Sequence, residues 1–185
     1  MKTEREKMTA GEPFQTNDPQ LMEDKKNART LAESYNHASE EDPERRQEIL
    51  RRLFGRCGEK FFIKPPFHCD YGYNIRIGEN FFANFDCVFL DAAPITIGDN
   101  CMIGPQTNIY AIGHPIDPAE RAKSIGLPSP VTIGDNVWIG GHVTILPGVT
   151  IGNNVVVGAG SVVTKSFPDN VVIAGNPAAI VKHIE

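Results

Sequence analysis

The sequence predicts an all-β fold, a parallel β-solenoid of triangular cross-section, with a helical cap at its N-terminus. A hexapeptide repeat carries this prediction, because valine recurs at every sixth position and an isoleucine or valine stands two positions after each one. These valines are Val131, Val137, Val143, Val149 and Val155. A slower modulation repeats every 18 residues, which is three hexapeptides per coil and therefore three faces. Two helix-start signals precede the repeats.

Residues 1–57 are predicted to form the helical cap. Asp18-Pro19 and Asp42-Pro43 each provide an N-cap carboxylate followed by proline at the first helical position. The two helices are expected to end near residue 37 and at Gly55. Their mixed charges are typical of solvated helix faces and indicate no function as a group.

Residues 58–185 are predicted to form the solenoid. Six-residue units begin at Ile75, and two extra residues intervene around residues 92–94 before the period resumes at Ile95. Residues 110–130 are rich in glycine and proline, so we expect a loop there that leaves the coil. Residues 166–185 depart from the repeat and are expected to cap the open end as a final strand and a short tail.

Outward-facing positions differ between two faces of the solenoid. Strand side chains alternate, so the residue between two inward positions points outward. One face then carries Arg76, Thr96, Thr132 and Thr150. The next carries Phe82, Met102, Trp138 and Val156. An apolar stripe on an outer surface needs covering, so it predicts a subunit interface or part of a ligand groove.

Composition excludes several classes. A net charge of −5 argues against nucleic acid or an anionic membrane surface as a partner. No stretch approaches 18 apolar residues and the N-terminal segment has no apolar core, so we expect a soluble, cytoplasmic protein. The four cysteines form no C-x-x-C pair, which favours free thiols over a zinc site or disulfides. They are Cys57, Cys69, Cys87 and Cys101.

Two residues stand out as candidates for chemistry. A lone histidine is usually structural or exposed, but His114 lies between Gly113 and Pro115 in the one long loop that leaves the repeat. Asn84 occupies a corner position that is glycine in later coils. Asparagine could be there because it tolerates a left-handed corner, or because its amide orients a ligand beside the apolar stripe. The pattern alone does not decide between these readings.

Several motifs resemble one enzyme family. NFFANFDC, IYAIGHPIDP, VTIGDNVWIGG, GAGSVVTK and AGNPA, together with the hexapeptides and the cap, are similar to the maltose/galactoside O-acetyltransferases over nearly the whole chain. The resemblance implies a left-handed parallel β-helix that works as a homotrimer with active sites between subunits. It also implies acetyl transfer from acetyl-CoA to a hydroxyl of a small sugar, with no metal required.

The resemblance assigns roles to individual residues. His114 matches the family's general base, and an imidazole suits that role because it titrates near neutrality. Asp18, Asp70 and Asn84 match positions that hold the acceptor sugar. The positions that match the CoA groove are Asn84, Trp138, Gly141, Ala159, Thr164, Lys165 and Lys182. Backbone N–H groups near Gly140 and Gly141 are expected to stabilise the oxyanion.

Three departures from the family pattern concern specificity and affinity. Asn27 stands where the family tends to have an arginine, and Gly141 where galactoside enzymes have a serine. Ala179 stands where the family often has an arginine or lysine after its Asn-Pro motif. The alternatives are a non-catalytic binding scaffold and a zinc carbonic anhydrase on the same fold. The second needs three convergent histidines, and the 28 residues from His114 to His142 are not a whole number of 18-residue coils.

Overall fold

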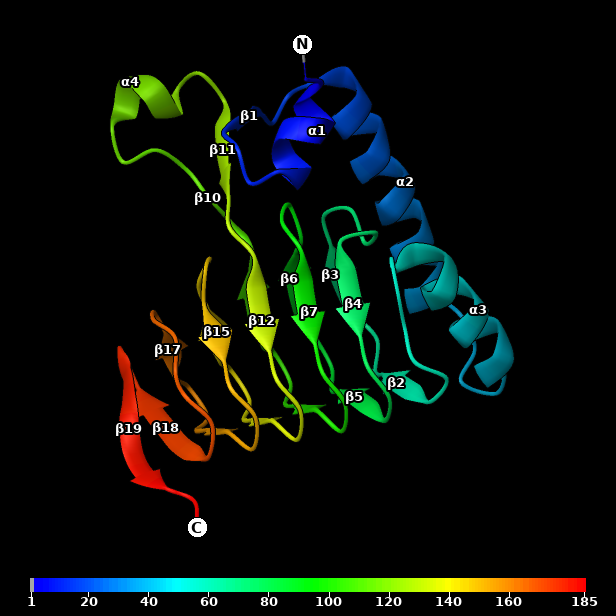
Figure 1. The fold of residues 1–185 in the computed structure, drawn as a ribbon. Coiled ribbons are helices and arrows are strands. Elements are labelled where there is room, and N and C mark those ends of the chain that lie inside the picture. The colour runs from blue at the N-terminus through cyan, green and yellow to red at the C-terminus, as the bar shows by residue number, and fades with distance from the viewer. Residues whose placement is uncertain (1) are drawn as a thin grey trace.

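The computed structural model describes residues 2–185 as a parallel β-solenoid with helices against one end (Figure 1). The first sheet contains β4 (Ile75–Ile77), β7 (Ile95–Ile97), β12 (Val131–Ile133) and β15 (Thr150–Ile151). The second sheet contains β2 (Phe61–Ile63), β5 (Phe81–Ala83), β8 (Met102–Ile103), β13 (Trp138–Ile139), β16 (Val156–Val157), β18 (Val171–Gly175) and β19 (Ala178–His183). The third sheet contains β3 (Phe67–Cys69), β6 (Cys87–Leu90), β9 (Asn108–Tyr110), β14 (Thr144–Ile145) and β17 (Val162–Val163).

The predicted phase of the repeat is confirmed. Thr96 pairs with Thr132 in the first sheet, and Met102 pairs with Trp138 in the second, in parallel register. The branched residues at alternate positions fill the interior, where Val131 and Ile145 are fully buried. Met102 and Trp138 are more than half exposed, so the apolar stripe lies on the outer surface of the second sheet.

The corner between the first and second sheets is held by a ladder of asparagines. Each adopts a left-handed backbone with φ between 53° and 59°, a conformation that asparagine tolerates better than most residues. The side-chain amide of each of the first four donates to the next asparagine along the solenoid, at 2.8–3.2 Å. The ladder consists of Asn80, Asn100, Asn136, Asn154 and Asn170. It links successive coils outside the apolar core.

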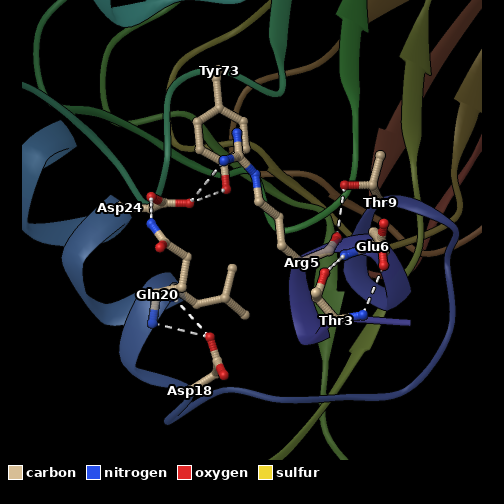
Figure 2. Close-up of polar contacts among 9 residues, drawn as sticks. Thr3, Arg5, Glu6, Thr9, Asp18, Gln20, Asp24 and Tyr73 are labelled. Carbon is tan, nitrogen blue, oxygen red and sulfur yellow. Dashed lines mark hydrogen bonds and ion pairs between the residues drawn. The ribbon is translucent and has the colours of Figure 1, made fainter. Parts of the chain in front are cut away.

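The helical cap contains three helices. Both predicted helix starts are confirmed, as α2 (Pro19–Asn36) and α3 (Pro43–Leu53). The short α1 (Glu4–Thr9) was not predicted; Thr3 and Glu6 form a capping box at its start, which Figure 2 shows. In α2, the buried Tyr35 donates its hydroxyl hydrogen to the carbonyl of Ile63, so the helix covers the first coil of the solenoid.

Residues 111–130, which we call the arm, leave the solenoid where the third sheet gives way to the first (Figure 1). The predicted loop contains regular structure: β10 (Ile112–Gly113), the one-turn α4 (Pro118–Arg121) and β11 (Ile125–Pro128). β10 pairs with β11, and β11 pairs with β1 (Phe14–Gln15) of the cap. At Gly126 an added Cβ would lie 2.7 Å from the Phe14 ring, so this close pairing requires glycine.

The C-terminal segment differs from the expected strand and short tail. Residues 178–183 form β19, which pairs antiparallel with β18, so the segment is a hairpin that extends the second sheet. The hairpin forms because the chain reverses around Gly175 and Pro177 and brings Ala178 opposite Gly175.

Candidate active site

His114 follows β10 in the arm, and its ring is fixed by a backbone contact. Its Nδ1 lies 2.9 Å from the carbonyl oxygen of Ile125 in β11. A carbonyl only accepts hydrogen bonds, so in the neutral ring the hydrogen is on Nδ1 and the lone pair is on Nε2. The residue is exposed. In this neutral form His114 presents the lone pair of Nε2 to the surroundings of the arm.

Asp18 and Asp70 lie on the same side of the molecule as the arm. Asp70 follows β3 at the corner between the third and first sheets, the corner from which the arm leaves two coils later. Its carboxylate lies 3.4 Å from the ammonium group of Lys25 in α2. Asp18 lies just after β1, the strand that braces the arm. Asp70 and the start of the arm thus lie at the same corner of the solenoid, and Asp18 lies in the cap segment that pairs with the arm.

The carboxylate of Asp18 is the N-cap of α2. It accepts hydrogen bonds from the backbone N–H groups of Gln20 and Leu21 at 3.1 and 3.2 Å (Figure 2). Both bonds use the same oxygen, Oδ1. The other carboxylate oxygen is therefore free of this capping role, and a second role for Asp18 is compatible with the first.

A groove follows the apolar stripe of the second sheet and brings four predicted site residues together. They are Asn84, Trp138, Gly141 and Ala159. The groove has a volume of about 470 Å³, and Phe82, Met102 and Val156 also line it. An elongated, mainly apolar groove with glycine at its edge suits a flexible chain that needs close approach to the backbone.

The backbone conformation of Asn84 excludes one of the two explanations for asparagine at this corner. Asn84 is not in the left-handed region; the left-handed residue of that corner is Asp86, with φ of 60°. The explanation that asparagine replaces a left-handed glycine is therefore wrong. The glycines at the equivalent corners serve close packing instead, since a Cβ on Gly104 would lie 2.5 Å from the backbone nitrogen of Gly141. The side-chain oxygen of Asn84 accepts from the N–H of Phe85 at 2.9 Å, which orients its NH₂ group.

Three predicted coenzyme residues lie outside this groove. Thr164 and Lys165 are exposed and follow β17, at the same corner as the arm but farther along the solenoid. Lys182 belongs to β19 and pairs with Val172. A single chain therefore does not gather all the predicted coenzyme positions at one place.

The expected oxyanion donors are corrected in part. The N–H of Gly140 donates to the carbonyl of Val157 at 2.8 Å, so it is occupied by the sheet and cannot serve. Within residues 2–185, the hydrogen bonds of the structure include none donated by the N–H of Gly141. Gly141 remains the candidate donor at the edge of the groove.

His114 and Asn84 are separated in a single chain. Asn84 lies at the corner before the third sheet, whereas the arm leaves at the corner after it. No arm residue lines the groove. The width of the third sheet, at roughly 3.3 Å per residue, lies between them. Figure 1 shows the arm rising beyond the upper end of the first sheet while β5 lies at the lower edge. His114 and the groove therefore lie at two separate places on a single chain.

Asp91 was not among the predicted site residues, although it lies between the two elements that carry Asp70 and His114. It follows β6 and is fully buried. Burial raises its pKa to about 6, although hydrogen bonds from backbone N–H groups lower it. The two extra residues at positions 92–94 marked this corner in the sequence, but burial of the carboxylate could not be seen there.

The cysteines are free thiols, as predicted. Cys87 and Cys101 are buried, and burial raises the pKa of each to about 11. They are protonated at neutral pH and are poor nucleophiles. Within residues 2–185, no group of three or more His, Cys, Asp or Glu side chains could hold a metal ion. Among the same residues, none of the helices has the length and apolar character needed to cross a membrane.

Three family profiles match the chain. One, described as the maltose acetyltransferase hexapeptide capping motif, matches residues 7–58. A second, the bacterial transferase hexapeptide of six repeats, matches residues 130–165, and a third, the hexapeptide repeat of succinyl-transferase, matches residues 94–107. Together with the solenoid, these matches define the class as a hexapeptide-repeat transferase.

Similar proteins narrow this class. The galactoside O-acetyltransferase of Escherichia coli (strain K12) is 42% identical over 97% of this chain and 92% of its own length. The chain therefore belongs to the maltose/galactoside O-acetyltransferase family. A crystal structure of a maltose O-acetyltransferase from Clostridium difficile 630 has a TM-score of 0.98 and 51% identity, and covers 100% of this chain and 98% of its own. A hexapeptide-repeat acetyltransferase from Vibrio cholerae O1 biovar eltor, complexed with acetyl coenzyme A, has a TM-score of 0.93 and 40% identity, and covers 100% of both chains.

Proposed function

We propose that this protein is an acetyl-CoA-dependent O-acetyltransferase that acetylates a hydroxyl of a small sugar such as maltose or glucose. The observation that carries the proposal is the contact between Nδ1 of His114 and the carbonyl of Ile125, at 2.9 Å. This contact leaves Nε2 as a proton acceptor on a braced arm. The family relationship and the acetyl coenzyme A bound by the Vibrio cholerae relative support acetyl-CoA as the donor.

The reaction follows from the position of that lone pair. Nε2 of His114 takes the proton of the acceptor hydroxyl as its oxygen bonds to the acetyl carbonyl carbon. The carbon–sulfur bond then breaks, and the imidazolium returns the proton to the leaving sulfur. The N–H of Gly141 and the amide of Asn84 would stabilise the charge that develops on the carbonyl oxygen. No covalent bond to the protein is needed.

The residues of the groove fit the donor. The apolar side chains of Trp138 and Met102 would contact its pantetheine chain, and Ala159 at the groove edge lets the chain lie close to the backbone. Lys165 and Lys182 would pair with its phosphates, with Thr164 as a hydroxyl partner. Asp18 and Asp70 would bind acceptor hydroxyls beside His114, since carboxylates accept several hydrogen bonds.

A homotrimer would bring the His114 arm of one subunit to the groove of another. Because His114 and Asn84 lie at opposite corners of the third sheet, the arm of one subunit would meet the groove of the next. The exposed stripe around Trp138 and Met102 provides an apolar surface for that contact. We expect light scattering at micromolar concentration to give about three times the 20.3 kDa chain mass. A monomer under those conditions would contradict the shared site.

A thiol-release assay tests the activity directly. Purified protein with acetyl-CoA is expected to release CoA faster when maltose or glucose is added, and mass spectrometry should find the acetylated sugar. A panel of galactosides and non-sugar alcohols would then rank acceptors, because a few pocket residues decide preference among similar sugars. If no acceptor accelerates thiol release above the rate without acceptor, the binding-scaffold alternative replaces the proposal.

A further inference from the structure

Asp91 fixes the turn that carries Asp70. Its Oδ1 accepts the backbone N–H of Asp70 at 3.1 Å and that of Tyr71 at 2.8 Å. Its Oδ2 accepts the N–H of Asn74 at 3.3 Å, and the Asn74 amide donates to the Asp91 carbonyl oxygen at 2.8 Å. One fully buried side chain therefore accepts from three backbone N–H groups of the turn 70–74.

The residues on either side of Asp91 also contact the start of the arm. The N–H of Ala111 donates to the carbonyl of Leu90, the residue before Asp91, at 3.0 Å. Ala92, the residue after it, belongs to a buried cluster with Phe14 and Tyr71, against which Ile112 of β10 packs. The segment 90–92 thus contacts both the turn that carries Asp70, through Asp91, and the start of the arm, through Leu90 and Ala92.

Burying the Asp91 carboxylate costs free energy that an uncharged residue at the same place would not cost. Desolvation of the ionised group is expensive, and the nearby Asp70 carboxylate adds to it. Other groups around Asp91 are Cys69, Tyr71 and Tyr73, none of which carries a compensating positive charge. The two cations beside this turn pair with other carboxylates, Lys25 with Asp70 and Arg5 with Asp24. The N–H groups are therefore the partners that keep Asp91 charged.

We propose that Asp91 is a positioning residue for the acceptor pocket, which holds the backbone of Asp70 so that its carboxylate faces the acceptor beside His114. This inference rests on the proposed sugar acetylation and assigns Asp91 no contact with either substrate. The Asp91 carboxylate sets the backbone of Asp70, while Lys25 orients its side chain.

Asp91→Asn is the test variant. An asparagine keeps one accepting oxygen, but its NH₂ group would oppose a backbone N–H, so the turn must open. We expect the KM for the sugar to rise about tenfold or more, with the KM for acetyl-CoA nearly unchanged. Hydrogen exchange followed by mass spectrometry should show faster exchange at the amides of Tyr71 and Asn74, by about tenfold.

Asp99→Asn is the matched control. The Asp99 carboxylate also accepts a backbone N–H, from Glu79 at 2.7 Å, but it lies at the exposed corner between the first and second sheets. Asn153 already fills the equivalent role two coils on, accepting from Asp135 at 2.8 Å. Asp99→Asn is therefore expected to retain both KM values. Equal losses in the two variants would mean that the effect of Asp91→Asn is general destabilisation, and would overturn the proposal.

A double-mutant cycle with Asp70→Asn tests whether Asp91 acts through Asp70. The double variant should bind the sugar no more weakly than Asp70→Asn alone. Unchanged amide exchange, or an unchanged sugar KM, in Asp91→Asn would overturn the proposal. If Asp91→Asn does not fold, Asn74→Ala removes one bond of the same turn and is judged by the same measurements. A wild-type protein without sugar acetylation would defeat the proposed function instead, and the exchange data would still show whether Asp91 holds the turn.

Discussion

Replacing His114 with alanine is expected to lower kcat for acetyl transfer by about two to four orders of magnitude, the usual contribution of general acid–base catalysis. The KM for acetyl-CoA should change little, because the proposed coenzyme contacts are made by groove residues such as Trp138 and by Lys165 and Lys182, whereas His114 acts on the acceptor hydroxyl. The measurement is steady-state thiol release with maltose or another accepted sugar. The variant should remain folded, since the exposed His114 ring makes one hydrogen bond, to Ile125.

His37→Ala is the control for this experiment. His37 is also exposed, and its Nδ1 lies 2.9 Å from the carbonyl of Glu33, so the two histidines make the same type of backbone contact. His37 lies at the C-terminal end of α2, remote from the arm along the chain. Its replacement should leave kcat unchanged. Equal activity of His114→Ala and wild type with every sugar would show that His114 is not the base.

Most of the fold could be predicted because the same pattern of buried apolar residues recurs in the sequence with every hexapeptide. Each hexapeptide buries the same two positions and turns at the same corner, so the period predicts three sheets and the register of Trp138 with Met102. The cap was predictable at α2 and α3, because Asp18 and Asp42 are N-cap residues followed by proline. α1 was not predicted, because it has six residues and one buried side chain, Met8, which is too few to show a helical period.

Contacts between distant segments were not predictable. β1 is two residues long and pairs with β11 more than 100 positions later, and nothing in either segment alone shows a partner. β19 was similarly hidden, since residues 178–183 are mostly exposed and show no alternation. The β1–β11 pairing is non-local and braces the arm that carries His114, whereas β18 and β19 form a local hairpin that no alternation in residues 178–183 indicated.

The candidate site was predictable in its chemistry but not in its geometry. The loop context identified His114 as a candidate, and the phase of the hexapeptide repeat identified Asn84 and the apolar stripe. Burial of Asp91, the backbone conformation of Asn84 and the engagement of the Gly140 N–H with Val157 all depend on neighbouring coils. Sequence phase places a residue on a face, but only packing between coils decides which of its hydrogen-bonding groups remain free.

Mixing two inactive variants tests the shared site most directly. His114→Ala and Asn84→Ala should each be nearly inactive alone, since each would damage every site of the proposed trimer. If His114 comes from one subunit and Asn84 from the next, random assembly of equal amounts should leave about a quarter of the sites with both residues intact, so about a quarter of the wild-type activity should return. Subunit exchange can be verified by native mass spectrometry.

The control mixture combines His114→Ala with the double variant His114→Ala/Asn84→Ala, in which no subunit supplies His114. That mixture should recover no activity at any ratio. Recovery in the first mixture alone requires the two residues to act across a subunit boundary, because no chain in it carries both. Absence of recovery in verified mixed trimers would mean that His114 and Asn84 act within one chain. The arm would then have to cross the third sheet to reach the groove, and the separation of the corners that carry Asn84 and His114 argues against that movement.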